Sequence, residues 1–200
     1  MKSKLVFVSV LLTLSFAGIL AIFWYQESQY LLPTPIPSNY QLVAAGKAVH
    51  LPALPGIDNR KPLLLHFFNP DCPCSRFNIE HFRKLMSKYQ GRLQFYAVLH
   101  TTDENETAEK FQKKYELGIP VISNTDHRLA IACGVYATPQ AAIIDQDGKL
   151  YFRGNYNKSR YCTDANSNFA QMAIDSLLAS KPSPDFIELA TTAYGCQLPD

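Results

Sequence analysis

One stretch of the chain, from Leu63 to Leu85, constrains the fold more than any other. It opens with the apolar run LLLHFF, passes through Asn-Pro-Asp to Cys72-Pro73-Cys74, and continues with apolar residues at steps of three and four. A short apolar run of this composition predicts a buried strand, and the later spacing predicts one face of a helix. We therefore expect Cys72 where a buried strand passes into the N-terminus of a helix.

That position favours a reactive thiol. The unpaired amides and the positive dipole end of a helix N-terminus stabilise an anion, and a thiolate placed there has a lowered pKa. Cys72 comes first in the turn, so we expect it to be more exposed and more acidic than Cys74, although the neighbouring Asp71 carboxylate opposes the shift. The alternative is that both cysteines are small buried apolar residues.

The N-terminus predicts a membrane segment. Leu5 to Tyr25 carries no charged residue, and Lys2 and Lys4 precede it. Such a run is long enough to span a bilayer, and the positive flank predicts a cytoplasmic N-terminus. A cleaved signal peptide, with Ser15-Phe16-Ala17 as its cleavage site, is the alternative. In both cases we expect the domain on the extracytoplasmic, periplasmic side of the cell membrane, where disulfides persist.

The rest of the chain divides by composition. We expect a cytoplasmic N-terminus and transmembrane signal anchor over residues 1–25, a proline-rich spacer over 26–61, a folded domain over 62–180 and a C-terminal tail over 181–200. In the domain, strands alternate with helices and a hairpin closes the sheet, which predicts an α/β fold with a mixed central sheet flanked by helices. The net charge of +2 gives no reason to expect a nucleic-acid partner. The oligomeric state stays open.

At this point the residues resemble a known family. The strand, the cysteine at a helix start and the segment GVYATPQAAIIDQDGKLYFRG at 134–154 are similar to the thioredoxin-like superfamily, in its membrane-anchored extracytoplasmic redoxin or thiol-disulfide oxidoreductase type. The resemblance covers about 62–180. It implies a thioredoxin-like fold, no cofactor, and exchange with protein thiols or disulfides. It also implies that Pro139 is cis and packs against Cys72, and that Thr138 offers its backbone to an extended partner chain.

The motif departs from the family pattern at one position. The family has a second cysteine where this chain has Ser75, and Cys74 lies one residue closer to Cys72. Two mechanisms stay open: Cys72 attacks a substrate disulfide and Cys74 resolves the mixed disulfide, or Cys72 acts alone and Ser75 donates a hydrogen bond to its thiolate. We expect Cys72, Cys74 and Pro139 to be catalytic. Pro73, which restricts the geometry, and Thr138 are expected to contact substrate.

Three further cysteines lie outside this motif. Cys162 follows the hairpin and Cys196 lies in the tail. A disulfide between them would stabilise an exported domain by about 2–4 kcal/mol, so we predict a structural Cys162–Cys196 bond. The alternative is that one of them exchanges electrons with Cys72. Cys133 is expected to be a buried small residue, with a resolving role opposite Cys72 as its alternative.

Two other classes of function stay open. Two thiolates and an imidazole suit a soft metal such as Cu(I), so Cys72, Cys74 and His81 or His100 could serve a copper-handling module. The other class is a non-catalytic thioredoxin-like binding domain whose cysteines form structural bridges. We expect no bound metal. Thiol titration, metal content and reduction of insulin disulfides would separate these classes.

Overall fold

A computed structural model describes residues 2–28, 31–103, 105–123 and 126–198. The chain divides into two compact units, Met1–Pro33 and Thr34–Asp200. The first unit contains the helix α1 (Lys2–Ser28), whose most apolar window has a mean hydropathy of 2.6 and no residue buried in the structure. By length and composition this helix can cross a membrane, as a signal sequence also can. The predicted apolar helix is confirmed.

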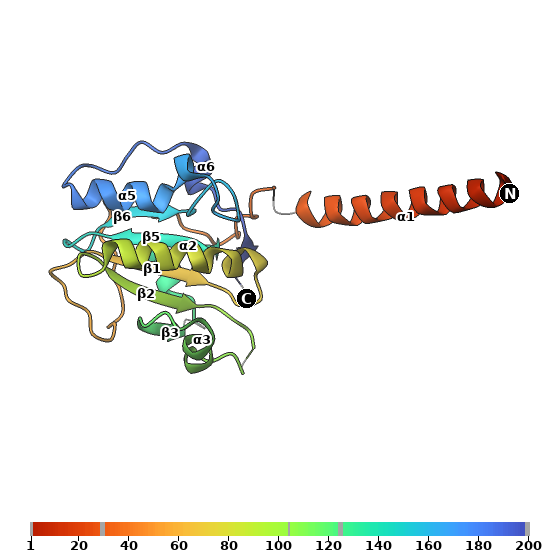
Figure 1. The fold of residues 1–200 in the computed structure, drawn as a ribbon. Helices are drawn as coiled ribbons and strands as arrows, with labels where there is room; N and C mark the ends of the chain where they lie inside the picture. Colours follow the sequence, from red (N-terminus) through yellow and green to blue (C-terminus); the bar gives the residue numbers. More distant parts are fainter. Residues whose placement is uncertain (1, 29–30, 104, 124–125, 199–200) are drawn as a thin grey trace. The chain divides into compact units, whose positions relative to one another are not determined.

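The second unit is built on a five-stranded sheet (Figure 1). Its strands, in spatial order, are β3 (Val121–Ser123), β2 (Gln94–Leu99), β1 (Leu63–Phe68), β5 (Gln140–Ile144) and β6 (Leu150–Gly154). The first three are parallel to one another, whereas β5 and β6 run antiparallel to their neighbours. The predicted mixed sheet is confirmed.

Helices cover one face of this sheet. All six residues of β1 are buried, so its alternate side chains supply both faces. Leu64 and Phe68 belong to a core cluster shared with α2 (Pro73–Tyr89), α3 (Ala108–Tyr115) and α5 (Phe169–Leu178). The α2 helix buries Phe82 and Leu85, which lie on its predicted apolar face. The predicted layer of helices over a central sheet is therefore present.

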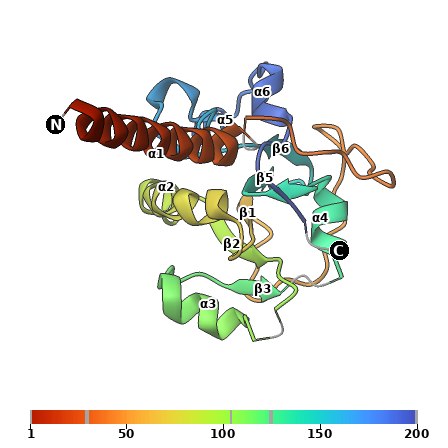
Figure 2. The same cartoon turned by 90° about the vertical axis from the view of Figure 1, so that its right-hand side faces the viewer.

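The opposite face is covered differently. Among the helices of the described residues, only the short helix α4 (Arg128–Cys133) packs there, on Leu65 and Phe67 of β1 (Figure 2). The segment 43–57, in which Leu54 is buried, adds to the cover, and Leu198 near the C-terminus also packs there. Its backbone joins the β5–β6 hairpin, because Val49 N donates to Gly148 O over 2.9 Å.

The boundary of the spacer therefore differs from the prediction. We expect a spacer over residues 26–61, outside the folded domain, but the chain from Thr34 onward belongs to the compact unit. The physical reason is the second face of the sheet. One six-residue helix cannot cover it, and an exposed apolar sheet face is unfavourable, so the extended segment packs there.

The C-terminal residues also join the fold. After the 3₁₀ helix η1 (Ala165–Ser167) and α5, the chain forms α6 (Glu188–Thr191), held by Asn155, whose Nδ2 donates to Leu189 O and Thr192 O. The chain then enters β7 (Cys196–Gln197), which pairs antiparallel with β4 (Ala137–Thr138) in a separate two-stranded sheet. The segment that we expected to be a tail thus ends as a paired strand.

Candidate active site

Cys72 lies at the junction of strand and helix. It is the N-cap residue of α2, in extended conformation at φ −80° and ψ 118°, with proline following at the first helical position. Two side chains fix the turn before it: Asn69 Oδ1 accepts a hydrogen bond from Asp71 N over 2.8 Å, and Ser75 Oγ accepts one from Asn69 N over 3.3 Å. The predicted place of Cys72 at a helix N-terminus is confirmed.

The proline loop faces this cysteine. The Thr138–Pro139 peptide bond is cis, as the resemblance implied. The sulfur of Cys72 lies 3.5 Å from the carbonyl oxygen of Thr138. Both residues are buried, and the loop enters β5 directly after the proline. The turn that carries Cys72 and the cis-proline loop therefore meet at the same end of β1 and β5.

A disulfide joins Cys72 to Cys196, whose Cα atoms are 5.9 Å apart although 124 positions separate them in the sequence. The predicted Cys162–Cys196 disulfide is wrong, since Cys162 carries a thiol. The reason is the pairing of β7 with β4. In that register Cys196 lies opposite Thr138, whose carbonyl oxygen is next to Cys72. Cys162 instead packs near α2, where Asn78 Nδ2 contacts its sulfur at 3.1 Å.

The tail is bonded to a second segment besides β4. Thr34 Oγ1 donates to Gly195 O over 3.1 Å and accepts from Gly195 N over 3.0 Å. The backbone N of Thr34 donates to Ala193 O over 2.8 Å. On the other side, Leu198 N donates to Tyr136 O over 3.2 Å. The strand that carries Cys196 is thus held along its length by main-chain and side-chain hydrogen bonds.

The exposure of the cysteines differs from the prediction. Cys72 is only 1% exposed and Cys74 2%, so Cys72 is not the more exposed of the two. The tail strand and its disulfide lie against Cys72, and the sequence of the motif contains no sign of that cover. Cys196 is half-buried. Cys196 is therefore the more accessible of the two bonded cysteines.

The thiols of Cys133 and Cys162 are poor nucleophiles at neutral pH. Burial raises the pKa of Cys133, at the end of α4, to about 12. Burial likewise raises the pKa of Cys162 to about 11, although the hydrogen bond from Asn78 opposes the shift; charge on Cys74 adds to it. Cysteine thiols react as thiolates, so neither residue is suited to attack a disulfide in this state.

The histidines near the motif are core residues or ring-stacked. His66 Nδ1 lies 2.7 Å from the Tyr156 hydroxyl, and its ring stacks on Phe82 with centroids 4.2 Å apart. His100 stacks on His127 at 5.3 Å. Within the described ranges, no group of three or more His, Cys, Asp or Glu side chains is arranged to hold a metal ion. The soft-metal set that we considered, Cys72, Cys74 and a histidine, is not assembled there.

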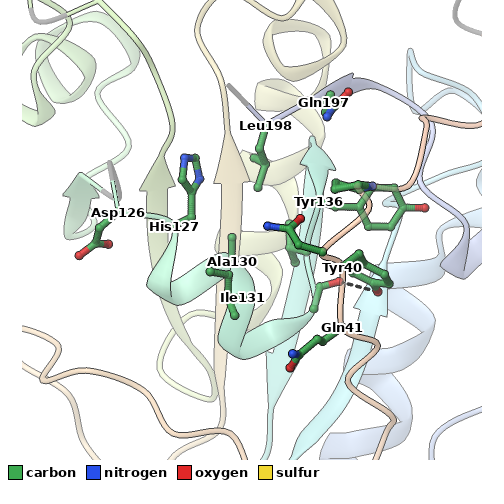
Figure 3. A pocket seen from close by; sticks show the side chains of 13 residues that line it. Tyr40, Gln41, Asp126, His127, Ala130, Ile131, Tyr136, Gln197 and Leu198 are labelled. Carbon is green, nitrogen blue, oxygen red and sulfur yellow. Dashed lines mark hydrogen bonds between the residues drawn. The ribbon is translucent and has the colours of Figure 1, made fainter. Parts of the chain in front are cut away.

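A cavity of about 410 Å³ adjoins the tail (Figure 3). Tyr40 and Tyr136, whose ring centroids are 4.9 Å apart, form one side, and the Tyr40 hydroxyl donates to Gly134 O over 3.0 Å. Ile131 of α4 and Leu198 of the tail also line the cavity. Burial raises the pKa of Tyr40. The tail thus forms part of the wall of this pocket.

Sequence reasoning missed one residue of this site, Thr34, and it considered an exchange between Cys196 and Cys72 only as an alternative. The pairing of Cys196 with Cys72 depends on a two-residue strand, which has no periodic signature. Thr34 lies far from the motif in the sequence and was counted in the spacer. The available signals were the odd number of cysteines and the glycine directly before Cys196. Neither of them identifies a partner.

The strand order and the geometry around Cys72 define the class of fold. Three parallel strands, an antiparallel hairpin, a cysteine at the N-terminus of α2 and a cis-proline before β5 make this a thioredoxin-like fold. The chain belongs to the family described as a domain of unknown function (DUF6436), whose model matches residues 41–198. A search of the curated proteins found no match.

Solved structures resemble this chain in fold. A hypothetical protein, SMc02350, from Sinorhizobium meliloti 1021 is 23% identical with a TM-score of 0.61, over 70% of this chain and 80% of that one. An uncharacterized conserved protein from Geobacillus kaustophilus is 20% identical with a TM-score of 0.60, over 70% and 77%. A thioredoxin-like protein in the oxidized form is 17% identical with a TM-score of 0.49, over 74% and 95%.

Proposed function

We propose that this chain is a membrane-anchored thiol-disulfide oxidoreductase that acts on protein thiols or disulfides outside the cytoplasm. Cys72 is its nucleophile and Cys196 its redox partner. One observation carries the proposal: a disulfide joins a cysteine at a helix N-terminus to a strand paired with the cis-proline loop. The helix N-terminus stabilises the thiolate that leaves when this disulfide is reduced. An apolar N-terminal helix and a disulfide both suit an exported, anchored domain.

Reduction of the protein consumes two donor thiols. A donor thiolate attacks Cys196 Sγ, a donor–Cys196 bond forms, and the Cys72–Cys196 bond breaks with its electron pair on Cys72. A second donor thiolate then attacks the donor sulfur of that mixed disulfide. Cys196 leaves as a thiolate and takes a proton, and the donor leaves as a disulfide. The protein has gained two electrons and the donor pair has lost two.

The reduced protein passes these electrons to a substrate. The Cys72 thiolate attacks a substrate disulfide, and the other substrate sulfur leaves as a thiolate and is protonated. Cys196 loses its proton to solvent, and its thiolate attacks Cys72 Sγ. The Cys72–Cys196 bond is restored, and the second substrate sulfur leaves as a thiolate that takes up a proton. The reverse sequence oxidises a substrate dithiol by the same steps.

The neighbouring residues have supporting roles in this proposal. Pro139 shapes the loop beside Cys72, and Thr138 supplies the backbone on which a partner strand pairs. Pro73 starts α2, because its fixed φ suits the first helical position. Cys74 is buried in the first turn of α2. Cys196 takes the resolving role that the motif suggested for Cys74, and Cys74 remains the competing candidate.

Three serine variants of the full chain in detergent test the proposal. With insulin as substrate and a dithiol as electron source, we expect Cys72→Ser to lose activity by at least about 100-fold, because the attacking thiolate is gone. Cys196→Ser should accumulate a mixed disulfide on Cys72, detected by mass spectrometry. Cys74→Ser is the matched control and should turn over like the wild type.

Two outcomes would redirect the proposal. Full activity in Cys72→Ser would end the oxidoreductase assignment, and a non-catalytic binding domain would be the better reading. A trapped mixed disulfide in Cys74→Ser, with normal turnover in Cys196→Ser, would return the resolving role to Cys74 and leave the Cys72–Cys196 bond as a structural staple.

A further inference from the structure

The C-terminal tail lies where a partner chain is expected. The strand edge of Thr138 is the surface that the resemblance reserves for an extended partner, and β7 of the same chain pairs with it. Cys196 lies opposite Thr138 and is bonded to Cys72. A cysteine in an extended strand, paired with this loop and linked to Cys72, has the arrangement of a substrate in a mixed disulfide. The tail thus presents the site with a substrate-like strand.

The residue before Cys196 fits this edge for a steric reason. A Cβ atom on Gly195 would overlap the carbonyl oxygen of Thr138 and would lie 3.6 Å from Pro139 Cδ. The overlapped atom belongs to the backbone, so it cannot rotate away as a side chain would. Any residue other than glycine at this place must move the strand off β4. The close approach of the two strands therefore demands glycine directly before the cysteine.

We propose that the tail is a built-in competitor for the protein substrate, and that the site accepts an extended segment with glycine immediately before its cysteine. This inference rests on the proposed function. In the oxidised protein the tail closes the site through the disulfide, the β4 pairing and the two hydrogen bonds between the Thr34 hydroxyl and the backbone of Gly195. A partner strand gains access to Cys72 only after the tail has left.

Opening begins at Cys196, because Cys72 Sγ is buried beneath the tail. An incoming thiolate forms a bond to Cys196 Sγ, and the electron pair of the broken disulfide leaves on Cys72 at the N-terminus of α2. When the tail moves away, Gln197 and Leu198 leave the wall of the adjoining cavity (Figure 3). The cavity then opens onto the vacated edge of β4 and offers room for side chains that follow the partner's cysteine.

Two peptides test the requirement for glycine. Reduced full-length Cys196→Ser in detergent is mixed with Thr-Ala-Tyr-Gly-Cys-Gln-Leu or with the same peptide carrying valine in place of glycine, each activated as a 2-thiopyridyl disulfide. Release of thiopyridone reports attack by Cys72. We expect the glycine peptide to react at least about 10-fold faster, as only it can pair with the edge of β4. Free glutathione, which has no such edge, should attack both peptides at equal rates.

A second variant tests the competition. In Cys196→Ser the tail can still dock, so adding Gly195→Val should displace it and speed the reaction with the glycine peptide by about 3-fold or more. Gly18→Val in the same background is the matched control, because a Cβ there meets no atom within 4 Å. It should leave the rate unchanged, and circular dichroism verifies that each variant is folded.

The results separate the inference from the function on which it rests. Equal rates for the two peptides, with Cys72 still reactive towards insulin, would overturn the glycine requirement and leave the oxidoreductase proposal intact. An unchanged rate in the folded Gly195→Val variant would overturn the competition. Failure of Cys72 to react with any disulfide would instead end the proposed function.

Discussion

His66 is buried in β1, against Phe82 and the hydroxyl of Tyr156. Burial, helped by the charge of His81, lowers its pKa from 6.5 to about 3. The unfolded chain therefore binds a proton near pH 6.5 that the folded chain does not. The contribution of the neutral ring to stability is complete above pH 6.5 and is lost as the pH falls below that value.

This shift predicts an acid-sensitive fold. Between pH 7 and pH 5, we expect His66 alone to lower the free energy of unfolding by about 2 kcal/mol, since each pH unit below 6.5 contributes about 1.4 kcal/mol. Urea midpoints of the full chain in detergent at both pH values measure the change. The double variant His66→Phe and Tyr156→Phe removes the titrating ring and its polar partner together, so its pH dependence should be smaller by that amount.

An exposed histidine supplies the control. His50 lies on the surface. The free energy of unfolding of His50→Gln should therefore depend on pH as that of the wild type does. The assignment to His66 would be wrong if the double variant lost as much stability on acidification as the wild type. The residual dependence would then come from other groups, with His100 as the first candidate because burial also lowers its pKa to about 3.

At the scale of elements, β7 depends on Thr34. The threonine hydroxyl makes two hydrogen bonds to Gly195, and each hydrogen bond contributes about 1 kcal/mol net. Thr34→Val keeps the shape and removes both bonds. We expect the closed Cys72–Cys196 form to be disfavoured by about 5- to 30-fold in a glutathione redox buffer, measured by thiol alkylation and mass spectrometry.

Thr34→Ser keeps the hydroxyl and should behave like the wild type, which separates the hydrogen bonds from the packing of the methyl group. If Thr34→Val has the same redox equilibrium as the wild type, Thr34 does not help to hold the tail. The glutathione ratio at half-oxidation is a suitable readout because a general loss of stability that leaves the domain folded would not move it.

The elements that sequence reasoning found are those with a local signature. The apolar run of β1 and the helical spacing of α2 place Cys72 at their junction, and the structure agrees within one residue. The prediction that the peptide bond before Pro139 is cis depended on the resemblance alone. The two-residue strands β4 and β7 are too short to show any periodicity, and their pairing joins residues about 60 positions apart. For this reason the sequence predicts a bond from Cys196 to Cys162, which also lies outside the motif, in the loop after the hairpin.

The prediction that the segment after Thr34 lies outside the folded domain was wrong for a related reason. Its prolines favour extended chain, and extended chain is what the structure contains, but composition does not say what the segment packs on. The surface on which this segment packs depends on how much of the second sheet face α4 leaves uncovered. The uncovered area is a property of the assembled domain. Local conformation was therefore predictable from these residues, while their role in the core was not.

At the scale of the whole molecule, α1 and the disulfide are the two features that bear on the location of the second unit. α1 carries lysine at its start and no acidic residue in its first turn. The second unit contains a disulfide, which cytosolic thiols would reduce. Both features fit export of the second unit across a membrane, with the positive end of α1 on the cytoplasmic side.

Reporter fusions after Asp200 test this topology. We expect alkaline phosphatase, which needs disulfides, to be active in the fusion and β-galactosidase to be inactive, because the segment following α1 is carried across the membrane. Deleting residues 2–28 should reverse both activities.

Fractionation then distinguishes an anchor from a cleaved signal. If α1 is retained, the wild-type chain stays with membranes after a carbonate wash, and Ala17→Leu, which removes the small residue at the cleavage site, changes nothing. Release of the wild type but not of Ala17→Leu would show cleavage, and β-galactosidase activity in the intact fusion would contradict export altogether.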